Sequence, residues 1–452
     1  MKKYILAFIT PALMLTGCNL VNVTDVQPVN QLEDENAITT VEKAQSALYG
    51  TYGILNGTGL AFTYYMPAAA SLMGVTMKPG NDGDDYFIND PKSQHYWVEN
   101  MYTSGYKLIN MSNHIITKTS VLPGDDPRKT RIIGEAKFLR ALGYFYLLRL
   151  YGEFYNEAST YGLVIRLTPV KDATAIPRSD VKATYEVILR DLDDAIKEAP
   201  DFRSTLYASK LSAMALKAKV LLYRKQYAAA AEMAKAVISS GQRKLESTFI
   251  QVFTKKIFQP EEAIFQTNFD LTSNLNNKGY AFNNWFAPAD YYTQLMKGDK
   301  RDTFALKVRG TRILNNKFNY GNIDGKPSPA DTEYFLRLAE IYLIQAEAIV
   351  RSGGTLEDAR TALNKVRKRA DMPDVELNDK QALLQAIREE KIKELGAESG
   401  EDWYDLVRFA TLGELDIKTF KPDFMGKQRY ILPLPYKSVQ SAGGVVVQNP
   451  GY

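Results

Sequence analysis

The 452-residue sequence predicts a mainly α-helical fold, with paired helices and a loop-rich region that contains short strands. Long stretches place apolar residues at helical spacing, which indicates amphipathic helices. Two stretches also place alanines twelve or thirteen residues apart, on either side of a predicted turn. Other segments lack both patterns and are interrupted by Asn, Gly and Pro, which is typical of irregular structure.

The chain opens with the features of a secretory signal peptide. A short cationic start, MKK, precedes an apolar run from residue 5 to residue 15, which is shorter than the roughly 20 residues of a membrane-spanning helix. The stretch LTGC, residues 15–18, resembles a bacterial lipobox, in which a peptidase cuts before a cysteine that carries lipid. We therefore expect residues 1–17 to be a lipoprotein signal peptide and Cys18, the only cysteine, to be lipidated. An ordinary cleaved signal followed by a free cysteine is the alternative.

Residues 18–38 are polar and predict a lipidated N-terminal tether, followed by one domain over residues 39–452. Apolar residues make up 45% of the chain and charged residues 24%, as in ordinary globular proteins. Removal of residues 1–17 lowers the formal net charge from +4 to +2, and this balance does not predict nucleic-acid binding. Past residue 17 no apolar run is long enough to span a membrane, so we expect only the lipid to anchor the protein.

Helices are predicted first at 131–152 and 179–200. The first stretch carries apolar side chains on one helical face. Its tyrosines are expected in the core: Tyr144, Tyr146 and Tyr151. The second stretch begins with an N-cap residue, Ser179 or Asp180, and ends at Pro200.

Residues 218–238 and 339–367 each predict two helices joined by a turn. The alanines that flank these turns are Ala218, Ala230, Ala346 and Ala359. Two helices pack closely where their facing side chains are small, so this spacing favours antiparallel helix pairs. The pattern resembles tetratricopeptide repeats.

Two long segments, residues 56–94 and 242–330, show no helical pattern. We expect irregular loops with short strands laid over the helices, and long irregular segments in compact proteins are often functional. Residues 428–452 are expected to contain one strand and then an extended tail.

The sequence offers no arrangement that predicts catalysis. His95 and His114 are the only histidines, and no G-x-S-x-G motif occurs. One predicted helix carries spaced glutamates: Glu389, Glu390, Glu394 and Glu398. Their spacing among lysines is typical of a solvated charged face rather than of a hydrolytic carboxylate pair. We predict that the protein is not an enzyme, with no catalytic residues and no cofactor.

The stretch NDGDDYFIND, residues 81–90, could in principle bind calcium through its carboxylates. The spacing of an EF-hand loop and its closing glutamate are absent, however. A turn rich in Asp and Gly needs no metal, and we predict none.

Motifs that run through the chain in a fixed order are WVENMYTSGYKLINMSN (97–113), GEAKFLRALGYFYLLRLYG (134–152), PRSDVKATYEVILRDLDDA (177–195), EEAIFQ (261–266), GDKRD (298–302), RLAEIYLIQAEAIVRSGG (337–354), ARTALNKVRKRA (359–370), DWYDLVRF (402–409) and QNPGY (448–452). Together, behind the LTGC stretch, they resemble the RagB/SusD family of surface nutrient-binding lipoproteins of Bacteroidota. The chain departs from the family pattern at three places, one of which is Glu153-Phe154 after Gly152, where proline is common. Asp402 stands where an arginine is common, and Glu390-Lys391 stands where a Glu-Arg pair is usual.

The resemblance implies a SusD-like fold with four tetratricopeptide-like helix pairs and a loop-rich second half. It implies a lipid-anchored protein on the outer face of the cell outer membrane. It also implies a partner, a SusC-like TonB-dependent transporter, which the lipoprotein covers like a lid and to which it delivers its ligand. The family has no catalytic residues that could be carried over to this chain.

Aromatic residues in the irregular segments are the candidate ligand contacts, because rings stack on the C–H faces of sugars and neighbouring amides can bind hydroxyls. The predicted ligand-binding residues are Trp285, Asn283, Asn284, Phe286, Tyr291, Tyr86 and Tyr96. Burial of these rings against the helices is the alternative. Trp97 and Trp403 lie within the family motifs and are expected to be packing residues.

We therefore expect a nutrient-binding lipoprotein whose ligand is an oligosaccharide. A peptide-binding member of the same family is one alternative. A tetratricopeptide-type scaffold is another, and it would bind a protein through its helices without using the loop-rich half.

Overall fold

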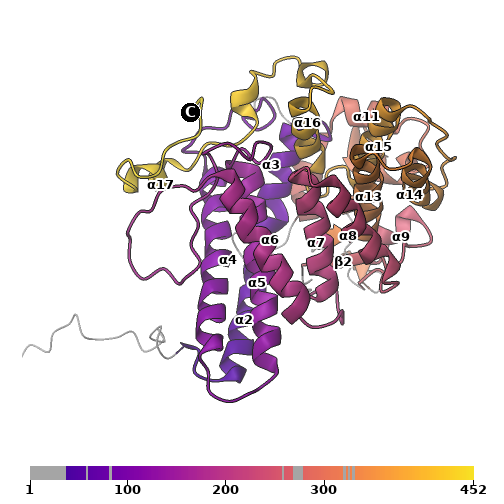
Figure 1. Cartoon of the computed structure of the whole chain (residues 1–452). Coiled ribbons are helices and arrows are strands. Elements are labelled where there is room, and N and C mark those ends of the chain that lie inside the picture. The colour runs from indigo at the N-terminus through magenta and orange to yellow at the C-terminus, as the bar shows by residue number, and fades with distance from the viewer. Residues whose placement is uncertain are drawn as a thin grey trace, which may run out of the picture. The chain divides into compact units, whose positions relative to one another are not determined.

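The computed structural model describes residues 37–56, 60–80, 84–256, 259–267, 278–318, 322–323, 326–327 and 331–452 (Figure 1). The predicted signal peptide, Cys18 and most of the predicted tether lie outside these residues. The described chain is mainly helical with a few short strands, which confirms the predicted fold class. None of the helices in these ranges combines the length and the apolar character that crossing a membrane requires.

Helices of the first half pack against one another in chain order (Figure 1). They are α2 (Val41–Leu55), α4 (Tyr96–Ser120), α5 (Arg128–Tyr151), α6 (Val181–Glu198), α7 (Lys210–Tyr223) and α8 (Tyr227–Ser239). The helices predicted at 131–152 and 179–200 are confirmed as α5 and α6. Asp180 is the N-cap of α6, because its carboxylate accepts a hydrogen bond from the backbone N–H of Ala183.

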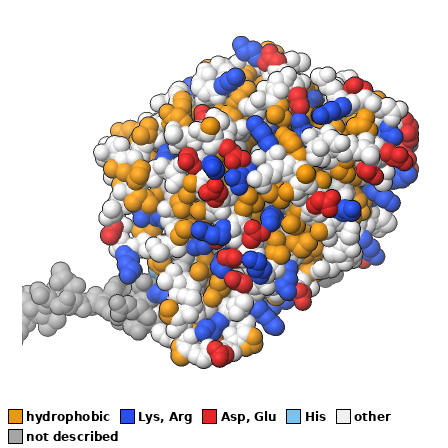
Figure 2. All heavy atoms as spheres, viewed as in Figure 1, with side chains coloured by type: hydrophobic (Ala, Val, Ile, Leu, Met, Phe, Trp, Pro, Cys, Tyr) orange, Lys and Arg blue, Asp and Glu red, His pale blue; other side chains and the backbone are white. Residues whose placement is uncertain are grey.

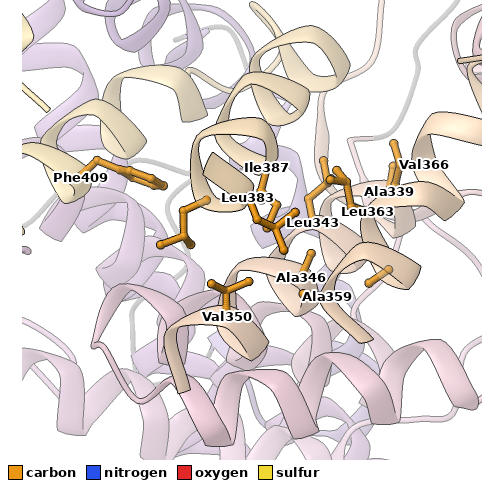
Figure 3. Packing of buried hydrophobic residues seen from close by; sticks show 12 residues of the cluster. Ala339, Leu343, Ala346, Val350, Ala359, Leu363, Val366, Leu383, Ile387 and Phe409 are labelled. Carbon is orange, nitrogen blue, oxygen red and sulfur yellow. The ribbon is translucent and has the colours of Figure 1, made fainter. Parts of the chain in front are cut away.

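A second group of helices continues this arrangement. Its members are α13 (Leu338–Ser352), α14 (Leu356–Arg369), α15 (Lys380–Leu395), α16 (Glu401–Thr411) and the short α17 (Tyr436–Ser441). Helix α13 packs against both α8 and α14, and Figure 3 shows Ala346 and Ala359 facing each other where α13 meets α14. Both alanines are fully buried, as are Ala218 and Ala230 in the α7–α8 pair. The predicted helix pairs are therefore confirmed.

The strands are short and form four antiparallel two-stranded pairs within the described residues. They are β1 (Met77–Pro79) with β3 (Phe286–Pro288), β2 (Ala263–Gln266) with β8 (Tyr334–Arg337), β4 (Leu306–Arg309) with β5 (Arg312–Asn315), and β6 (Asn322–Ile323) with β7 (Lys326–Pro327). The short helices around them are α9 (Phe249–Thr254), α10 (Lys278–Asn284), α11 (Asp290–Met296), α12 (Asp302–Ala305) and the 3-10 turn η4 (Asn316–Phe318). The loop-rich region thus has the predicted character.

The segment predicted to be irregular at 56–94 is partly helical, and that part of the prediction is wrong. It contains the π-helix η2 (Ala61–Tyr65) and the helix α3 (Met66–Met73). Every residue of α3 is buried, so its sequence is apolar on all sides and shows no amphipathic period. Pro67 lies in its first turn, where the missing N–H costs no helical hydrogen bond.

The strand predicted within residues 428–452 is absent from the described structure, which instead has a 3-10 turn, η6 (Lys427–Arg429), and α17. The chain between η6 and α17 is extended but pairs with none of the strands in the described residues. Leu432 donates its N–H to the carbonyl of Leu150, and Leu434 donates its N–H to the side chain of Gln448. Pro433 and Pro435 alternate with these donors, and prolines cannot continue a strand ladder.

The largest difference between the predicted and the observed surface is the exposure of the glutamates that were predicted to face solvent. Figure 2 shows acidic and basic side chains intermingled on one face. However, Glu390, Glu394 and Glu398 are at most 4% exposed, so the prediction is wrong for these three. Arginines from distant parts of the chain neutralise them, and spacing within one helix cannot reveal such partners.

We call this cluster the buried ion network; it comprises Glu262, Arg301, Lys317, Arg337, Arg369, Glu390, Glu394 and Glu398. Glu394 accepts hydrogen bonds from Arg301 Nη1 at 2.9 Å and Arg337 Nη1 at 2.7 Å, and also from Arg369. Burial alone would raise the pKa of Glu394, but Arg369, Arg337 and Arg301 outweigh it and hold that pKa below its usual range.

Glu394→Gln should lower the free energy of unfolding by roughly 3–5 kcal/mol, because three buried arginines would lose their shared counter-charge. Urea denaturation at constant pH measures this change. The matched control is Glu389→Gln on the same helix, whose partially exposed carboxylate has no arginine partner among the described ion pairs; it should shift stability by less than about 0.5 kcal/mol. Equal losses in the two variants would contradict the role of the network.

Candidate ligand-binding site

Strands β1 and β3 bring the two loop-rich segments of the sequence together. Met77 pairs with Pro288 and Pro79 pairs with Phe286. Just beyond the ribbon, the backbone N–H of Gly80 donates to the carbonyl oxygen of Trp285 at 2.8 Å. A Cβ at position 80 would lie only 3.0 Å from that oxygen, so glycine permits this close approach.

We call four partly exposed rings the aromatic platform: Tyr65, Tyr96, Trp97 and Trp285. Tyr65 contacts Tyr96 and Trp97, and Trp285 is connected to them through the buried ring of Tyr64. Tyr96 and Trp285 are 60% and 55% exposed, so each has an open ring face. The ring centroid of Tyr65 lies 5.7 Å from that of Tyr96 and 5.0 Å from that of Trp97. Two predicted contacts from distant segments, Tyr96 and Trp285, are therefore linked through the rings of Tyr65 and Tyr64.

Four buried rings support the platform, and we call them the aromatic base: Tyr64, Tyr86, Phe282 and Phe286. The ring centroid of Tyr64 lies 5.5 Å from that of Trp97 and 6.1 Å from that of Trp285, so it joins the two tryptophans. Tyr86 and Phe286, both predicted ligand contacts, are 1% and 4% exposed. Their rings lie beneath the platform and offer no open face for stacking.

The first turn of α4 sets the position of Tyr96 and Trp97. His95 is the N-cap, and its Nδ1 accepts a hydrogen bond from the backbone N–H of Trp97 at 3.1 Å. Burial lowers the pKa of His95, although Asp85 and Asp84 act in the opposite direction. A lowered pKa favours the neutral imidazole, which is the form that can accept this bond.

Polar groups lie at the edges of the platform. Asn284 is exposed beside Trp285, whereas Asn283 is buried and donates its side-chain amide to the carbonyl of Gly279. On α4, Asn100 donates its amide to the hydroxyl of Tyr96 at 3.2 Å. The candidate site thus combines open ring faces with amide groups at its edges, of which Asn284 was a predicted contact and Asn100 was not.

Tyr291 is the predicted contact that the structure places elsewhere. It follows β3 in the first turn of α11, and its ring centroid lies 5.1 Å from that of Phe420. Together with Phe420 it lines a separate pocket. Sequence proximity to Trp285 therefore did not bring Tyr291 onto the platform.

Sequence reasoning missed Tyr64 and Tyr65, and it treated Trp97 only as a packing residue. Trp97 does pack against Tyr86, with the ring centroids 5.2 Å apart, but it keeps part of its surface exposed. The pair Tyr64-Tyr65 lies within a segment that lacked an amphipathic pattern. Its adjacent rings were the available signal. Trp403 is 1% exposed, as expected for a packing residue.

The acidic turn predicted not to need a metal is held by hydrogen bonds. Asp84 accepts from the backbone N–H groups of Tyr86 and Phe87 at 2.8 and 3.1 Å. Asp90 forms an ion pair with Arg429 at 2.8 Å. In the part of the chain that the structure describes, no group of three or more His, Cys, Asp or Glu side chains is arranged to hold a metal ion; Asp82 lies outside that part.

Comparisons with known proteins match both halves of the chain. The model of the SusD family matches residues 276–452, and the model described as "Starch-binding associating with outer membrane" matches residues 66–222. A SusD-like protein P2 from Formosa agariphila is 25% identical, and the match covers 100% of both chains. A SusD-like protein from Bacteroides ovatus is 24% identical, covering 90% of this chain and 82% of the other.

Solved structures share the fold. A SusD superfamily protein from Bacteroides thetaiotaomicron matches with a TM-score of 0.79 at 22% identity, covering 91% of this chain and 100% of the other. A laminarin-binding SusD-like protein matches with a TM-score of 0.75 at 22% identity, covering 91% and 99%. The two family models, the full-length relatives and the shared helical fold agree, and together they support a SusD-like protein.

Proposed function

We propose that this protein is an outer-membrane lipoprotein that binds an oligosaccharide on the aromatic platform and delivers it to a SusC-like TonB-dependent transporter. The observation that carries the proposal is the platform itself, in which exposed rings from two distant segments lie beside amide groups. One matching family model is described as starch-binding and one structural neighbour as laminarin-binding, which supports the same ligand class.

The chemistry of the platform suits a sugar. The C–H faces of a pyranose pack against open rings such as those of Trp285 and Tyr96. Burial and the neighbouring Tyr96 raise the pKa of Tyr65 to about 12, so its hydroxyl stays protonated and can donate or accept a hydrogen bond at neutral pH. Rings hold the ligand while amides and hydroxyls orient it, which a flat apolar surface could not do.

Trp285→Ala should weaken binding of the cognate glycan roughly three- to tenfold, because a lost stacking contact costs about 0.5–1.5 kcal/mol beyond the lost area. The melting temperature should change little, since the ring is 55% exposed. Calorimetric titration with maltoheptaose and laminarihexaose, paired with thermal melting, measures both quantities.

The matched control for that experiment is the adjacent Phe286→Ala. Its ring is 4% exposed in the aromatic base, so this variant should lose roughly 3–5 kcal/mol of stability. Unchanged glycan affinity in Trp285→Ala, or a collapse of its melting temperature, would remove Trp285 from the proposed binding site.

Cys18 is proposed to be the lipidated N-terminus that anchors the protein, on the basis of the LTGC stretch. Cys18→Ala should move the protein out of the membrane fraction, because several acyl chains are needed for stable anchoring. Cell fractionation and mass spectrometry of the native N-terminus measure this. A Cys18→Ala variant that stays in the membrane, together with an unacylated native N-terminus, would contradict the proposal.

The transporter partnership is proposed from the likeness of the chain to SusD-like proteins. Affinity purification of the tagged lipoprotein in mild detergent should recover a TonB-dependent barrel encoded beside its gene. Mass spectrometry identifies the recovered barrel, and the Cys18→Ala variant tests whether co-localisation at the membrane is required. Recovery of the lipoprotein alone, when both proteins are expressed, would count against delivery through such a barrel.

A peptide is the second candidate ligand, and one observation favours it. A cavity of about 490 Å³ lies between α4, the loop over residues 164–176 and the C-terminal segment. Its walls include the aliphatic side chains of Ile109, Val164 and Val170 rather than open tryptophan faces. Such walls accept apolar side chains better than sugar hydroxyls. If maltoheptaose or laminarihexaose displaced peptides that are bound to the protein, both ligand classes would share one site. The cavity would then be excluded as a separate peptide-binding site.

A further inference from the structure

A second pocket, separate from the aromatic platform, lies where the β1–β3 ribbon meets the chain around Phe420. Its volume is about 220 Å³, which is below the roughly 300–1,000 Å³ of pockets that hold drug-sized ligands. A pocket of this size takes one small ring rather than a chain. The pocket is lined by Phe87, Asn89, Tyr291 and Phe420, and also by Lys78 and Asp290.

Three half-buried rings line the walls of this pocket: Phe87, Tyr291 and Phe420. Tyr291 and Phe420 meet edge to face, with their centroids 5.1 Å apart and their planes at 85°. This geometry fixes both rings, so they form a preformed wall rather than a mobile cover.

Asn89, one of the residues that line the pocket, has a buried side-chain oxygen without a hydrogen-bond partner among the described residues. Asn89 is fully buried, and its amide nitrogen donates to the carbonyl of Met73 at 3.1 Å. That bond fixes the orientation of the amide, and the Asn89 Oδ1 atom then has no hydrogen-bond partner in the described residues. A buried carbonyl oxygen without a partner is costly. A hydroxyl donated by a ligand would satisfy it.

The backbone beneath the pocket is held from both sides. The ammonium of Lys421 donates to the carbonyls of Leu72 and Met73 at 3.0 and 2.8 Å, and to that of Gly74. The carboxylate of Asp402 accepts from the next backbone N–H groups, those of residues 75 and 76, at 2.7 and 3.1 Å. The residues that carry Asn89's partner therefore cannot shift easily, and a ligand would meet an organised site.

The charges in the lining favour a ligand without net charge. Lys78 and Asp290 form an ion pair of 2.6 Å. Asp423 also lines the pocket, and burial lowers the pKa of Lys421 to about 7, so Lys421 carries only part of a positive charge at neutral pH. A cation would face the two lysines and an anion would face the two aspartates. A ligand that fits this lining would offer a hydrogen-bond donor to Asn89 Oδ1 and an apolar face to the rings.

We propose that this pocket binds a single neutral sugar unit, at a site distinct from the aromatic platform. The proposal rests on the proposed carbohydrate function, because it assigns a second site to the same ligand class. It also gives a role to Tyr291, which the sequence associates with ligand binding but which lies away from Trp285.

Saturation-transfer NMR on the full chain with methyl α-glucoside and methyl β-glucoside tests the proposal. Both probes are single rings, and they represent the units of starch and laminarin. The measurements are made in the Trp285→Ala background, in which the contribution of the platform is reduced. Binding should persist there, and adding Tyr291→Ala or Asn89→Gly should weaken it at least fivefold. Asn89 has a φ of 58°, so glycine removes the amide without straining the backbone.

Tyr49→Ala is the matched control, because this exposed tyrosine lies on α2 and outside both sites; it should leave glucoside binding unchanged. Melting temperatures show whether each variant is folded, and the two pocket variants alter different elements. Loss of glucoside binding in Trp285→Ala alone, or no effect of either pocket variant, overturns the proposal. Tighter binding of glucosamine or glucuronate than of the glucosides overturns the assignment of a neutral ligand.

The possible outcomes distinguish failure of the pocket proposal from failure of the proposed carbohydrate function. If wild-type protein binds maltoheptaose or laminarihexaose but the Trp285→Ala protein binds no glucoside, the pocket proposal fails and the platform proposal stands. If the wild-type protein binds none of these glycans or glucosides, the carbohydrate function fails and the pocket proposal fails with it.

Discussion

The pairing of Glu394 with three arginines is the constraint on which the loop-rich half depends. Arg301 precedes α12, Arg337 ends β8 and Arg369 ends α14, so one carboxylate on α15 ties together elements that are distant in sequence. Lys317 connects this network to the candidate ligand-binding site. It donates to the carbonyls of Glu394 and Gly396 at 2.9 and 3.1 Å. The next residue, Phe318, has its ring centroid 4.6 Å from that of Phe282 in the aromatic base. The buried charges therefore position the floor of the platform.

Burying so many charges imposes directionality that an apolar core would not. An arginine presents its donors in a fixed fork, so it pairs well only when the carboxylates around it lie at defined positions. Arg337 illustrates this, because it reaches Glu262 at 2.7 Å, Glu394 at 2.7 Å and Glu398 at 2.8 Å. Short strands and loops have little backbone pairing of their own to fix their positions. Here the ion pairs supply the positional information that a larger sheet would supply elsewhere.

The sequence predicted what depends on local patterns and missed what depends on distant partners. The helix α6 and its N-cap Asp180 follow from spacing and capping within a few residues, and both are observed. Glu394 was misread because a helix of alternating charges has the same pattern whether it faces water or distant arginines. At the candidate site, the irregular context singled out Trp285 and Tyr96, and both side chains are exposed in the structure. Tyr64 was missed because only the fold brings it between the two tryptophans, and Tyr291 was grouped with Trp285 because sequence distance cannot show that α11 leads it to Phe420.

The β1–β3 ribbon is the element that the platform and the second pocket share. On one side, Phe286 of β3 lies in the aromatic base, and Trp285 just before it is held by the N–H of Gly80. On the other side, Lys78 of β1 lines the pocket and pairs with Asp290 at 2.6 Å. Arg312 of β5 also restrains this stretch, because it donates to the carbonyl of Asn283 at 2.7 Å. Because successive residues of a strand point to opposite faces, a ribbon three residues long is enough to serve two sites. Because three residues of pairing fix a surface only weakly, the contacts of Gly80 with Trp285 and of Arg312 with Asn283 also help to position the proposed binding surface.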